Sequence, residues 1–526
     1  MDNITISERR IRKMIKQLRR GCSPGVDGIS AEHLYHGLGT PLSLHLSVLL
    51  TLCLRFGCLP DSFCLGQLVP ILKKSHLDPS SAASYRPITV SVMMSKLIEL
   101  YVLDECSDHT PHPCQFGFTE YRGTNTAVTL AHDVAAYCHA RGSPIYLCSL
   151  DAEGAFDGIP HCILFLKAAA ALPDHCWRLL FWWYTRMAVV IKWNGAISPP
   201  IPVQRGTRQG GLTSPFLFNL FYEDLVDELS SMNCGIIIRG TRHNVFCYAD
   251  DVLLASTTPS GLQQLINTAV RVISQQGLRF NPAKTICMTY GKSSFEKAPS
   301  WLIQGTKLKQ ECVMKYLGVE LSNDRGGRHA NERIRAAQRA FYSLQGAGLH
   351  FHGLDVHVAA KLYSVGVRTI LTYGCEAIAM SRSNLTKLES TQGKLIKTVL
   401  GLRKFSRNSP LLKALNVPLI EKTVAFNSLN LLRSCIRHHS NATCFYSSLL
   451  LSPASTSGLN TLVNRCATLV PNLNFIDLVF NNSYLNAMKK SLYSYDCDGL
   501  VDSIRILLVD YNEGARSMVQ YLVNAF

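Results

Sequence analysis

The chain has 526 residues, of which 47% are hydrophobic and 17% are charged. This balance excludes an intrinsically disordered protein, and the length allows two or three packed subdomains around more than one core. The net charge of +16, from 53 Lys and Arg against 37 Asp and Glu, favours a polyanionic partner such as nucleic acid.

The amino terminus has no signal-peptide pattern, and the 19 cysteines are scattered singly without a CxxC pair. We therefore expect reduced, buried cysteines in an intracellular protein. The most apolar run, residues 41–60, contains His45 and Arg55. It is interpreted as a core helix and not as a membrane span, so no membrane partner is expected.

The first predicted element is a basic amphipathic helix over residues 7–20, followed by Gly21 as a stop signal. Its apolar stripe recurs at helical spacing and consists of Ile11, Met14, Ile15 and Leu18. Residues 31–57 are also predicted to be helical. Residues 67–72 are typical of a strand, which ends in the basic pair Lys73-Lys74.

The middle third alternates short apolar runs with helical patterns. Residues 145–150 form an apolar run that ends at Asp151, as expected for a buried strand. Ser214 is predicted to cap a helix with Pro215 in its first turn. Further strand segments are predicted over residues 245–255 (two strands around an Asp-Asp turn), 285–290 and 312–321.

Beyond about residue 325 the pattern becomes helical, with polar linkers predicted near residues 322–329 and 403–410. The helical spacing is shown by Leu385, Leu388, Leu395, Ile396 and Val399. Mixed strands and helices followed by a helical block indicate an α+β architecture. One domain boundary is expected near residue 325 and a weaker one near residue 450.

Three carboxylates stand out by their position. Asp151 ends an apolar strand, and Asp250-Asp251 lie at a turn between two apolar runs. Adjacent acids repel, and a bound cation relieves that repulsion; oxygen ligands of this kind suit Mg²⁺. Asp is also common in ordinary turns, so the motif alone does not decide between a metal site and a simple connection.

The order of motifs resembles the reverse transcriptases of non-LTR (LINE-type) retrotransposons. Nine blocks follow the order of that family over about residues 20–320. In chain order they are Ser23-Pro-Gly-Val-Asp-Gly-Ile29, Val69-Pro-Ile-Leu-Lys-Lys74, Tyr85-Arg-Pro-Ile88, Gln115-Phe-Gly-Phe118 with Gly123-Thr-Asn-Thr126, the Asp151 segment, Gly206-Thr-Arg-Gln-Gly-Gly-Leu-Thr-Ser-Pro215, Tyr248-Ala-Asp-Asp251, Asn281-Pro-Ala-Lys284 and Lys315-Tyr-Leu-Gly318.

The resemblance implies an α+β right-hand polymerase fold with fingers, a palm built on an antiparallel sheet, and a helical thumb. Four regions are predicted on this basis. They are an amino-terminal helical extension with the opening motif (1–55), fingers and palm (56–322), a helical thumb-like region (323–450) and a carboxy-terminal region of unknown role (451–526).

The implied activity is RNA-directed DNA polymerisation, in which a primer 3′-hydroxyl attacks the α-phosphate of a dNTP. Two Mg²⁺ ions, for which Mn²⁺ could substitute, would be held by Asp151 and Asp250, with Asp251 assisting. The implied partners are an RNA template, a DNA primer, their RNA–DNA hybrid and dNTPs. Contacts to the nucleic-acid phosphates would be sensitive to salt. The oligomeric state is left open.

The resemblance assigns two basic residues to the triphosphate. Arg86 offers a forked contact to phosphate, and Lys73 offers a point charge, with Lys74 as an alternative to Lys73. The backbone of Ala152 would contact the same triphosphate.

Other matched positions imply roles around the sugar, the base and the leaving group. Phe156 would exclude a ribose 2′-hydroxyl by steric clash, and Gln209 and Gly210 would contact the template and the incoming base. Lys284 would protonate the leaving pyrophosphate. The primer grip is expected at Tyr316, Leu317 and Gly318.

Two departures from the family pattern are visible. Only about 20 residues precede the opening motif, where LINE proteins commonly carry an endonuclease, so a partial element product is expected. The residues Cys435, His438, His439 and Cys444 lack the CxxC half of a zinc knuckle, and no zinc site is predicted.

Three alternatives remain open from the sequence. They are a group II intron-type reverse transcriptase, a catalytically silent RNA-binding relic, and another palm enzyme such as a cyclic-nucleotide synthase. The segments Tyr85-Arg-Pro-Ile88 and Lys315-Tyr-Leu-Gly318 favour the LINE type, and the intact carboxylates argue against a relic. Nuclear action is expected from the family resemblance alone.

Overall fold

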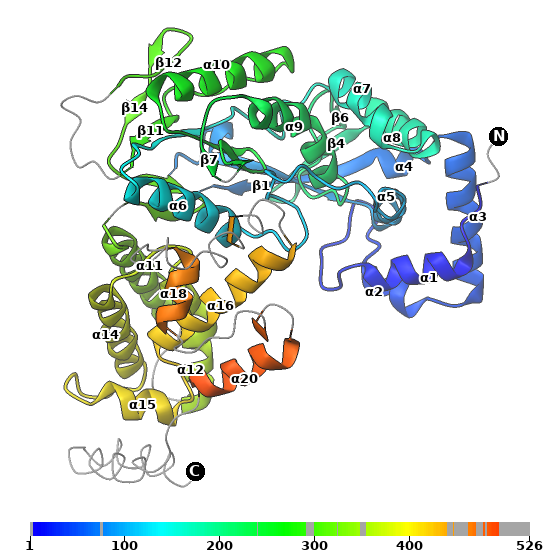
Figure 1. Ribbon diagram of the computed structural model, residues 1–526. Helices are drawn as coiled ribbons and strands as arrows, with labels where there is room; N and C mark the ends of the chain where they lie inside the picture. Colours follow the sequence, from blue (N-terminus) through cyan, green and yellow to red (C-terminus); the bar gives the residue numbers. More distant parts are fainter. Residues whose placement is uncertain are drawn as a thin grey trace.

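The computed structural model describes residues 4–73, 77–238, 240–290, 299–322, 324–347, 354–438, 445–446, 461–469, 477–478 and 481–493. Figure 1 shows sheets covered by helices in the upper part of the molecule and a helical part below them. Mixed helices and sheets confirm the α+β class at this coarse level. No helix within the described ranges is long and apolar enough to span a bilayer.

The amino-terminal helices pack through the predicted apolar stripe. Helix α1 (Glu8–Gln17) is capped by Ser7, buries Ile11, Met14 and Ile15, and packs against α3 (Thr40–Phe56) and α5 (Met93–Glu105). It ends three residues before the predicted limit. The helix predicted over residues 31–57 is divided into α2 (Ala31–His36) and α3, because the chain turns at residues 37–39.

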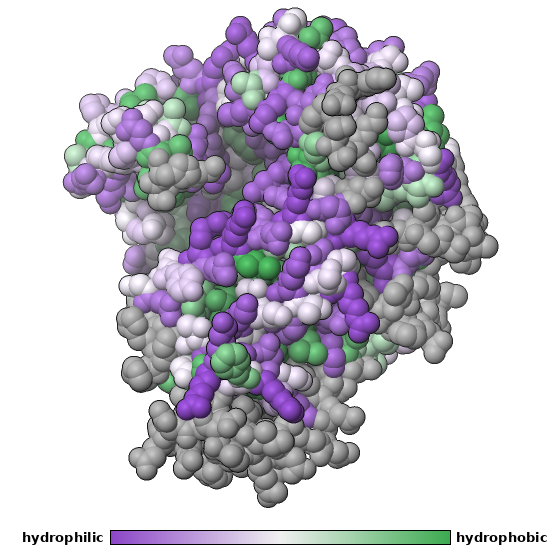
Figure 2. Space-filling model, turned by 90° about the vertical axis from the view of Figure 1, so that its left-hand side faces the viewer, coloured by the Kyte–Doolittle hydropathy of each residue, from purple (hydrophilic) through white to green (hydrophobic). Residues whose placement is uncertain are grey.

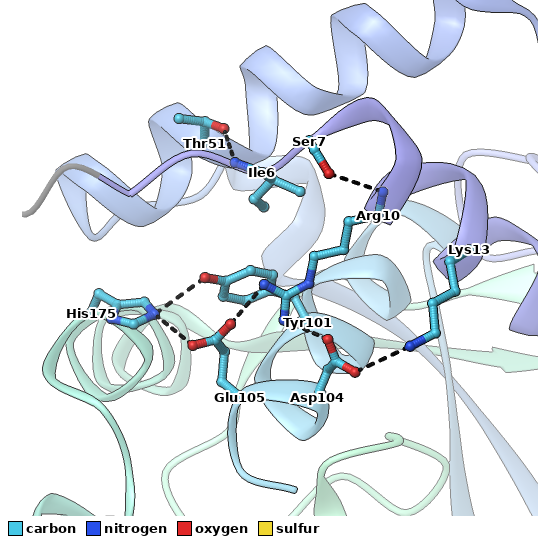
Figure 3. Close-up of polar contacts among 9 residues, drawn as sticks. All are labelled: Ile6, Ser7, Arg10, Lys13, Thr51, Tyr101, Asp104, Glu105 and His175. Carbon is cyan, nitrogen blue, oxygen red and sulfur yellow. Dashed lines mark hydrogen bonds and ion pairs between the residues drawn. The ribbon is translucent and has the colours of Figure 1, made fainter.

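A network of charged and aromatic side chains joins α1 to α5 and to α8 (Asp174–Arg186), as Figure 3 shows. The Arg10 guanidinium lies 2.6 Å from an Asp104 oxygen and 2.7 Å from a Glu105 oxygen, and it stacks over the Tyr101 ring at 4.2 Å. His175 of α8 lies 3.8 Å from Glu105. These partly exposed ion pairs add only modest stability. They fix the orientation of α5, the helix that also carries the buried Glu99.

The first sheet contains β1 (Leu65–Leu72), β2 (Tyr85–Ser91), β4 (Ala188–Trp193), β5 (Ala196–Ile197) and β6 (Ile201–Pro202). Strands β1 and β2 pair antiparallel with Val69 opposite Ile88, and β1 pairs parallel with β4. The strand predicted over residues 67–72 begins two residues earlier, at the end of the short helix α4 (Asp61–Cys64).

The second sheet has the order β14-β11-β3-β10-β9. Its central strand β3 pairs antiparallel with both neighbours. The members are β3 (Tyr146–Leu150), β9 (Val245–Tyr248), β10 (Asp251–Ser256), β11 (Ile286–Thr289) and β14 (Lys309–Gln310). The strands predicted over residues 145–150, 245–255 and 285–290 therefore all belong to one sheet.

Helices cover both faces of the second sheet. Alternate residues of β3 point to opposite cores: Cys148 packs in the core that includes α9 (Ser214–Ser231) and α10 (Pro259–Gln275), and Leu147 packs in the core of α6 (Thr124–Ala140). The cap predicted at Ser214 is wrong by one residue. Thr213 occupies the cap position, because the Ser214 hydroxyl donates to the Arg208 carbonyl at 2.6 Å instead.

Several short elements complete this half of the chain. They are the 3-10 turn η1 (Ala82–Ser84), α7 (His161–Ala171), the hairpin strands β7 (Ile237–Ile238) and β8 (Thr241–Arg242), the strands β12 (Leu302–Ile303) and β13 (Thr306–Lys307), and the hairpin β15 (Met314–Tyr316) and β16 (Val319–Leu321). The last hairpin resolves the strand predicted over residues 312–321 into two.

The helical part is predicted correctly in kind, but its linkers are shorter than expected. Helix α11 begins at Gly327 and α15 at Asn408, inside the predicted linkers 322–329 and 403–410. The elements are α11 (Gly327–Gly346), α12 (Val356–Tyr363), the π-helical η2 (Ser364–Arg368), α13 (Thr369–Thr372), α14 (Arg382–Val399), α15 (Asn408–Ala414), α16 (Ile420–His438), α18 (Leu462–Leu469) and α20 (Asn482–Tyr493).

A buried carboxylate joins the carboxy-terminal helices to the second sheet. Asp133 of α6 is fully buried and accepts from the Tyr446 hydroxyl at 3.1 Å, the Leu462 amide at 2.6 Å and the Arg465 guanidinium at 3.1 Å. Helix α18 thus packs with α6 in one core. The predicted boundaries at residues 55, 322 and 450 remain predictions. Nothing in the described residues of 451–526 gives that region a role.

The face shown in Figure 2 is mostly hydrophilic, with hydrophobic side chains present only in small, separate groups. A face of this kind suits contact with solvent or with a charged polymer better than burial against an apolar partner.

Candidate active site

The three predicted metal ligands lie together at one end of the second sheet. Asp151 directly follows β3, and Asp251 begins β10. The two strands pair with Leu150 opposite Val252, so the register places Asp151 beside Asp251. Asp250 precedes Asp251 in the turn that joins β9 to β10.

Burial and the crowding of these carboxylates raise the pKa values of Asp250 and Asp251. Burial raises the pKa of Asp250, and the charge of Asp151 raises it further, whereas Arg86 lowers it. Burial and then the charges of Asp250 and Asp151 raise the pKa of Asp251 to about 6. Asp251 still faces solvent in part, so burial alone does not account for its raised pKa, and the two neighbouring carboxylates contribute to it. A cation placed here would relieve the repulsion.

Lys284 lies at the edge of this cluster. Its ammonium is 3.5 Å from Asp151 Oδ2, and about two thirds of the side chain is exposed. The loop before β11 is tied to the same place, since the Asn281 amide donates to the Asp151 carbonyl at 2.8 Å. The structure therefore brings Lys284 to the carboxylates.

The predicted dNTP-binding residues line one cleft of about 530 Å³, together with Asp250. These residues are Lys73, Arg86, Ala152, Phe156, Gln209 and Gly210. The cleft is also lined by residues for which the sequence predicts no contact with dNTP, namely Tyr85, Phe118, Asp157 and Arg208. Six residues from four separate motifs thus meet next to a carboxylate of the cluster.

Lys73 and Arg86 lie at the ends of paired strands. Lys73 follows β1, and its ammonium donates to the Ala83 carbonyl at 2.9 Å, while its amide donates to Ser84 at 2.8 Å. Arg86 lies in β2 opposite Ile71. The alternative residue, Lys74, lies outside the described residues.

The Phe156 ring is held from two sides. It stacks on Phe218 of α9 with ring centroids 4.0 Å apart, and it meets Phe118 edge to face at 6.0 Å. A ring fixed in this way presents a rigid surface to the cleft, as a steric filter requires.

A buried ion pair anchors the loop of residues 206–211. The guanidinium of Arg208 donates to Glu99 Oε1 of α5 at 2.9 Å and stacks over Trp183 at 4.1 Å. Both members of the pair are almost fully buried. The Thr213 hydroxyl donates to the same Glu99 oxygen at 3.1 Å, which links the loop to the start of α9.

Gln209 and Gly210 are placed by this anchor against β2. The Gln209 carbonyl accepts from the Thr89 amide at 2.8 Å, and its side chain donates to Asp157 at 2.7 Å. Gly210 has a φ of +115°, and a Cβ there would lie 2.5 Å from the Thr89 carbonyl oxygen. Only glycine fits this approach without strain.

The predicted primer-grip residues form the turn of the β15–β16 hairpin. The Tyr316 side chain is 2% exposed, and its hydroxyl donates to the Phe246 carbonyl of β9 at 3.1 Å. It therefore packs inside the fold and cannot touch a primer directly. The Leu317 carbonyl accepts from Tyr373 at 3.0 Å, and Gly318 lies beside the same ring. Primer contact by this turn remains a prediction.

The donor set fits a divalent cation that shares its ligands with a substrate. No three His, Cys, Asp or Glu side chains within the described ranges converge closely enough to bind an ion by themselves. Mg²⁺ does not require this, since it commonly binds one or two carboxylates plus phosphate oxygens and water. Asp151 Oδ2 is buried and accepts no hydrogen bond from the described residues; the Lys284 ammonium faces it at 3.5 Å, so a lone pair stays available for such an ion.

Two further residues of the site were not assigned a role from the sequence. Gln115, known only as part of a motif, accepts at Oε1 from the Gly117 amide at 2.9 Å and from the Ala249 amide at 3.0 Å. Glu99 lies on an otherwise apolar face of α5 and holds Arg208. A lone acid on an apolar helix face was the only signal for the second.

Comparison with known proteins agrees with this arrangement. Residues 71–321 match the family described as reverse transcriptase (RNA-dependent DNA polymerase). The chain is 24% identical over 448 residues to a Drosophila melanogaster protein named "Probable RNA-directed DNA polymerase from transposon BS", covering 81% of this chain and 48% of the relative. It is 23% identical over 437 residues to "RNA-directed DNA polymerase from mobile element jockey" of Drosophila funebris, covering 80% and 46%.

The chain spans about half the length of these relatives. Among solved structures, an apo telomerase from Candida Tropicalis, truncated from its C-terminal domain, shares 11% identity and covers 51% of this chain and 55% of its own. The TM-score of 0.36 is too low for that likeness to support any argument.

Proposed function

The chain carries a reverse transcriptase domain related to the RNA-directed DNA polymerases of non-LTR retrotransposons, and from this premise we propose that it extends a DNA primer along an RNA template. We assign the β1–β2 sheet to the fingers, the sheet around β3 to the palm and the helices from α11 onward to the thumb. The substrates are dNTPs and the product is a growing DNA strand paired with RNA.

One observation carries the proposal. Residues from four distant motifs line a single cleft with Asp250, and Asp151 and Asp251 lie beside each other at the same end of the second sheet. An ordinary Asp-Asp turn would not require a basic strand pair, a fixed phenylalanine and a glycine loop around the same space. Together they offer groups for a triphosphate, a sugar and a base.

The residues act mainly by position and charge. Arg86 and Lys73 neutralise the triphosphate, and Phe156 occupies the space that a ribose 2′-hydroxyl would need. Gln209 and Gly210 contact the nascent base pair through a loop held rigidly from behind. Orientation of this kind supplies a large share of catalysis in phosphoryl transfer.

Asp151 and Asp250, assisted by Asp251, are the groups that would hold divalent cations, with Mg²⁺ as the proposed ion. Such ions supply charge neutralisation for the attacking and leaving oxygens. Lys284 would donate a proton to the leaving pyrophosphate, and its ammonium lies 3.5 Å from Asp151 Oδ2, which supports this role. The carboxylates must be ionised for this role.

The test is primer extension on an RNA template with dNTPs and Mg²⁺, comparing the unchanged protein with Asp250→Ala. We expect the substitution to lower the extension rate about 10³-fold, because it removes a group that stabilises charge in the transition state. Binding of the RNA–DNA hybrid, measured by fluorescence anisotropy, should be retained.

Asp61→Ala is the matched control, since Asp61 is 92% exposed and belongs to no part of the site. It should extend primers at the unchanged rate. Absence of extension by folded, unchanged protein that still binds hybrid would contradict the proposal and support an RNA-binding relic.

A further inference from the structure

Gln115, the first residue of the motif Gln115-Phe-Gly-Phe118, has no role in the mechanism described so far, yet it touches the carboxylate turn directly. The motif runs beside β9 as an extra strand-like segment. The Phe116 amide donates to the Cys247 carbonyl at 2.7 Å, and the Cys247 amide donates to the Cys114 carbonyl at 2.9 Å. This pairing carries the Gln115 side chain to the end of β9, where the turn begins.

The turn itself has an unfavourable backbone. Ala249, between Tyr248 and Asp250, has a φ of +53°. The left-handed region is unfavourable for an L-residue with a Cβ, and glycine avoids that cost. Something outside the turn must therefore hold it in this conformation.

Gln115 supplies the contact that does so. Its Oε1 atom accepts from the Ala249 amide at 3.0 Å and from the Gly117 amide at 2.9 Å, so one oxygen joins the two segments. The side chain is 2% exposed, so water does not compete for these donors. A buried amide left unpaired is costly, which makes the contact effective.

The neighbouring glycine shows how closely the two segments approach. A Cβ at position 117 would lie 2.3 Å from the Ala249 amide nitrogen, so only glycine allows this distance. The Gly117 carbonyl in turn accepts from Asn219 of α9 at 3.0 Å. The segment is thus fixed on its far side and can act as a support.

We propose that Gln115 is a positioning residue, which holds the strained Ala249 turn so that Asp250 and Asp251 point to the phosphates. It touches neither substrate nor cation. The inference rests on the proposed polymerase function, because the position of the carboxylates matters only if they act on phosphate. The hydrogen bonds themselves are independent of that function.

The first experiment measures the turn without any activity. Hydrogen exchange of the peptide spanning residues 245–256 is followed by mass spectrometry in metal-free protein. Gln115→Met keeps the length and volume of the side chain but removes the accepting oxygen. We expect exchange of the turn amides to quicken at least fivefold, while the peptides of β3 and α6 stay protected.

The second experiment measures primer extension by the same variants. Gln115→Met should lower kcat about tenfold and leave the KM for dNTP and the affinity for hybrid within twofold. A merely structural role would lower the thermal midpoint and reduce all three parameters together. The split between kcat and KM therefore separates positioning from stability.

The third experiment uses the backbone strain as a rescue. If Gln115 acts by holding a left-handed Ala249, then adding Ala249→Gly to the Gln115→Met variant should raise its kcat about threefold. In the unchanged background the same substitution should gain nothing. This coupling is read from a double-mutant cycle.

Gln276→Met is the matched control. Gln276 is also a buried glutamine, 5% exposed, but it lies at the end of α10 and its side chain has no hydrogen-bond partner within the described residues. It should leave exchange of the 245–256 peptide and kcat unchanged.

Two results would overturn the inference: equal exchange of the turn in Gln115→Met and unchanged protein, or a loss of kcat that Ala249→Gly does not relieve. If the unchanged protein extends no primer, the proposed function fails instead, whatever the exchange shows. The two failures are thus distinguishable.

Discussion

Two loops carry the site, and they are anchored in opposite ways. The loop of residues 206–211 hangs on a buried ion pair between Arg208 and Glu99, with the guanidinium also stacked on Trp183. The turn at Ala249 is held by the neutral amide of Gln115. One anchor uses full charges and the other uses none, although both are buried.

The difference follows from what each loop presents. The turn carries Asp250 and Asp251, whose pKa values are both raised by burial and by the charge of Asp151, with Asp250 also raising that of Asp251. A further charged anchor there would act directly on their ionisation, whereas an amide holds the backbone without adding net charge. The 206–211 loop carries no acid that must stay ionised, and the charge of Arg208 is balanced by Glu99, so a charged anchor is compatible with its position at the cleft.

The comparison predicts that the two anchors fail differently. Arg208→Met should mainly cost stability, because it leaves Glu99 buried without its partner. Breaking a buried pair from one side typically costs about 3–5 kcal/mol. Urea unfolding should show this loss.

Combining Arg208→Met with Glu99→Leu should recover a large part of the lost stability, since replacement of both charges by apolar groups is often tolerated. Equal destabilisation by the single and double variants would show that the pair is not what anchors the loop.

The turn should instead lose activity with its fold intact. Gly117→Ala would place a Cβ 2.3 Å from the Ala249 amide nitrogen, and backbone on both sides leaves little room to yield. We expect the turn to shift and primer extension to fall at least about 100-fold, as misplacement of catalytic groups by about 1 Å commonly causes.

Gly346→Ala serves as the control for this prediction, because a Cβ there meets open space. Circular dichroism should show the secondary structure of the unchanged protein for both variants, so that the loss of extension is not due to unfolding. A Gly117→Ala protein with normal extension would show that the approach of the two segments is not required.

A milder effect is expected at the loop. Gly210→Ala combines a φ of +115° with a Cβ 2.5 Å from the Thr89 carbonyl oxygen, so the loop must move away from β2. We expect the KM for dNTP to rise about tenfold with a smaller change in kcat, since the loop positions substrate. Steady-state primer extension at varied dNTP concentration measures both.

Gly305→Ala is the control here, since Gly305 also has a positive φ but nothing lies within 4 Å of its added Cβ. It isolates the cost of backbone conformation from the cost of collision. Equal effects of the two substitutions on the KM for dNTP would show that the 206–211 loop does not position the substrate.

Local signals in the sequence were enough to predict the strands that carry the acids. Asp151 follows an apolar run and Asp250-Asp251 lie at a turn between two more, so the sheet edge could be predicted before any contact was known. Two predicted details are wrong: α11 begins at Gly327 inside the predicted linker, where Asp324 accepts from the Arg328 amide, and Thr213 caps α9 with its hydroxyl bound to the distant Glu99.

The anchors could not be predicted in the same way. Gln115 and Ala249 are 134 residues apart, and Glu99 and Arg208 are 109 apart. Periodicity and capping report only on near neighbours in the chain, so they indicate which residues enter the cleft but not which residues hold them there. Tyr316 shows the same limit, since its burial follows from packing against β9.

The smallest predicted effect concerns the charge on the turn. Burial and the two neighbouring carboxylates raise the pKa of Asp251 to about 6 from its ordinary value of 3.8. Between about pH 4 and 6 the folded protein therefore binds more protons at this site than the unfolded chain does. Stability from this group falls as pH rises through that window, and the penalty is complete above it.

Asp251→Asn should remove the penalty at the expense of activity. In metal-free buffer at pH 7.5 we expect the thermal midpoint to rise by about 1–2 °C relative to the unchanged protein. At pH 4 the difference should vanish, since Asp251 is then protonated. Added Mg²⁺ should narrow the gap at pH 7.5, because the cation relieves the same repulsion in the unchanged protein. The exposed Asp61→Asn variant should show no such pH dependence. If Asp251→Asn and the unchanged protein have equal thermal midpoints from pH 4 to 8, repulsion among the carboxylates does not destabilise the turn. The neutrality of the Gln115 anchor would then have no electrostatic advantage.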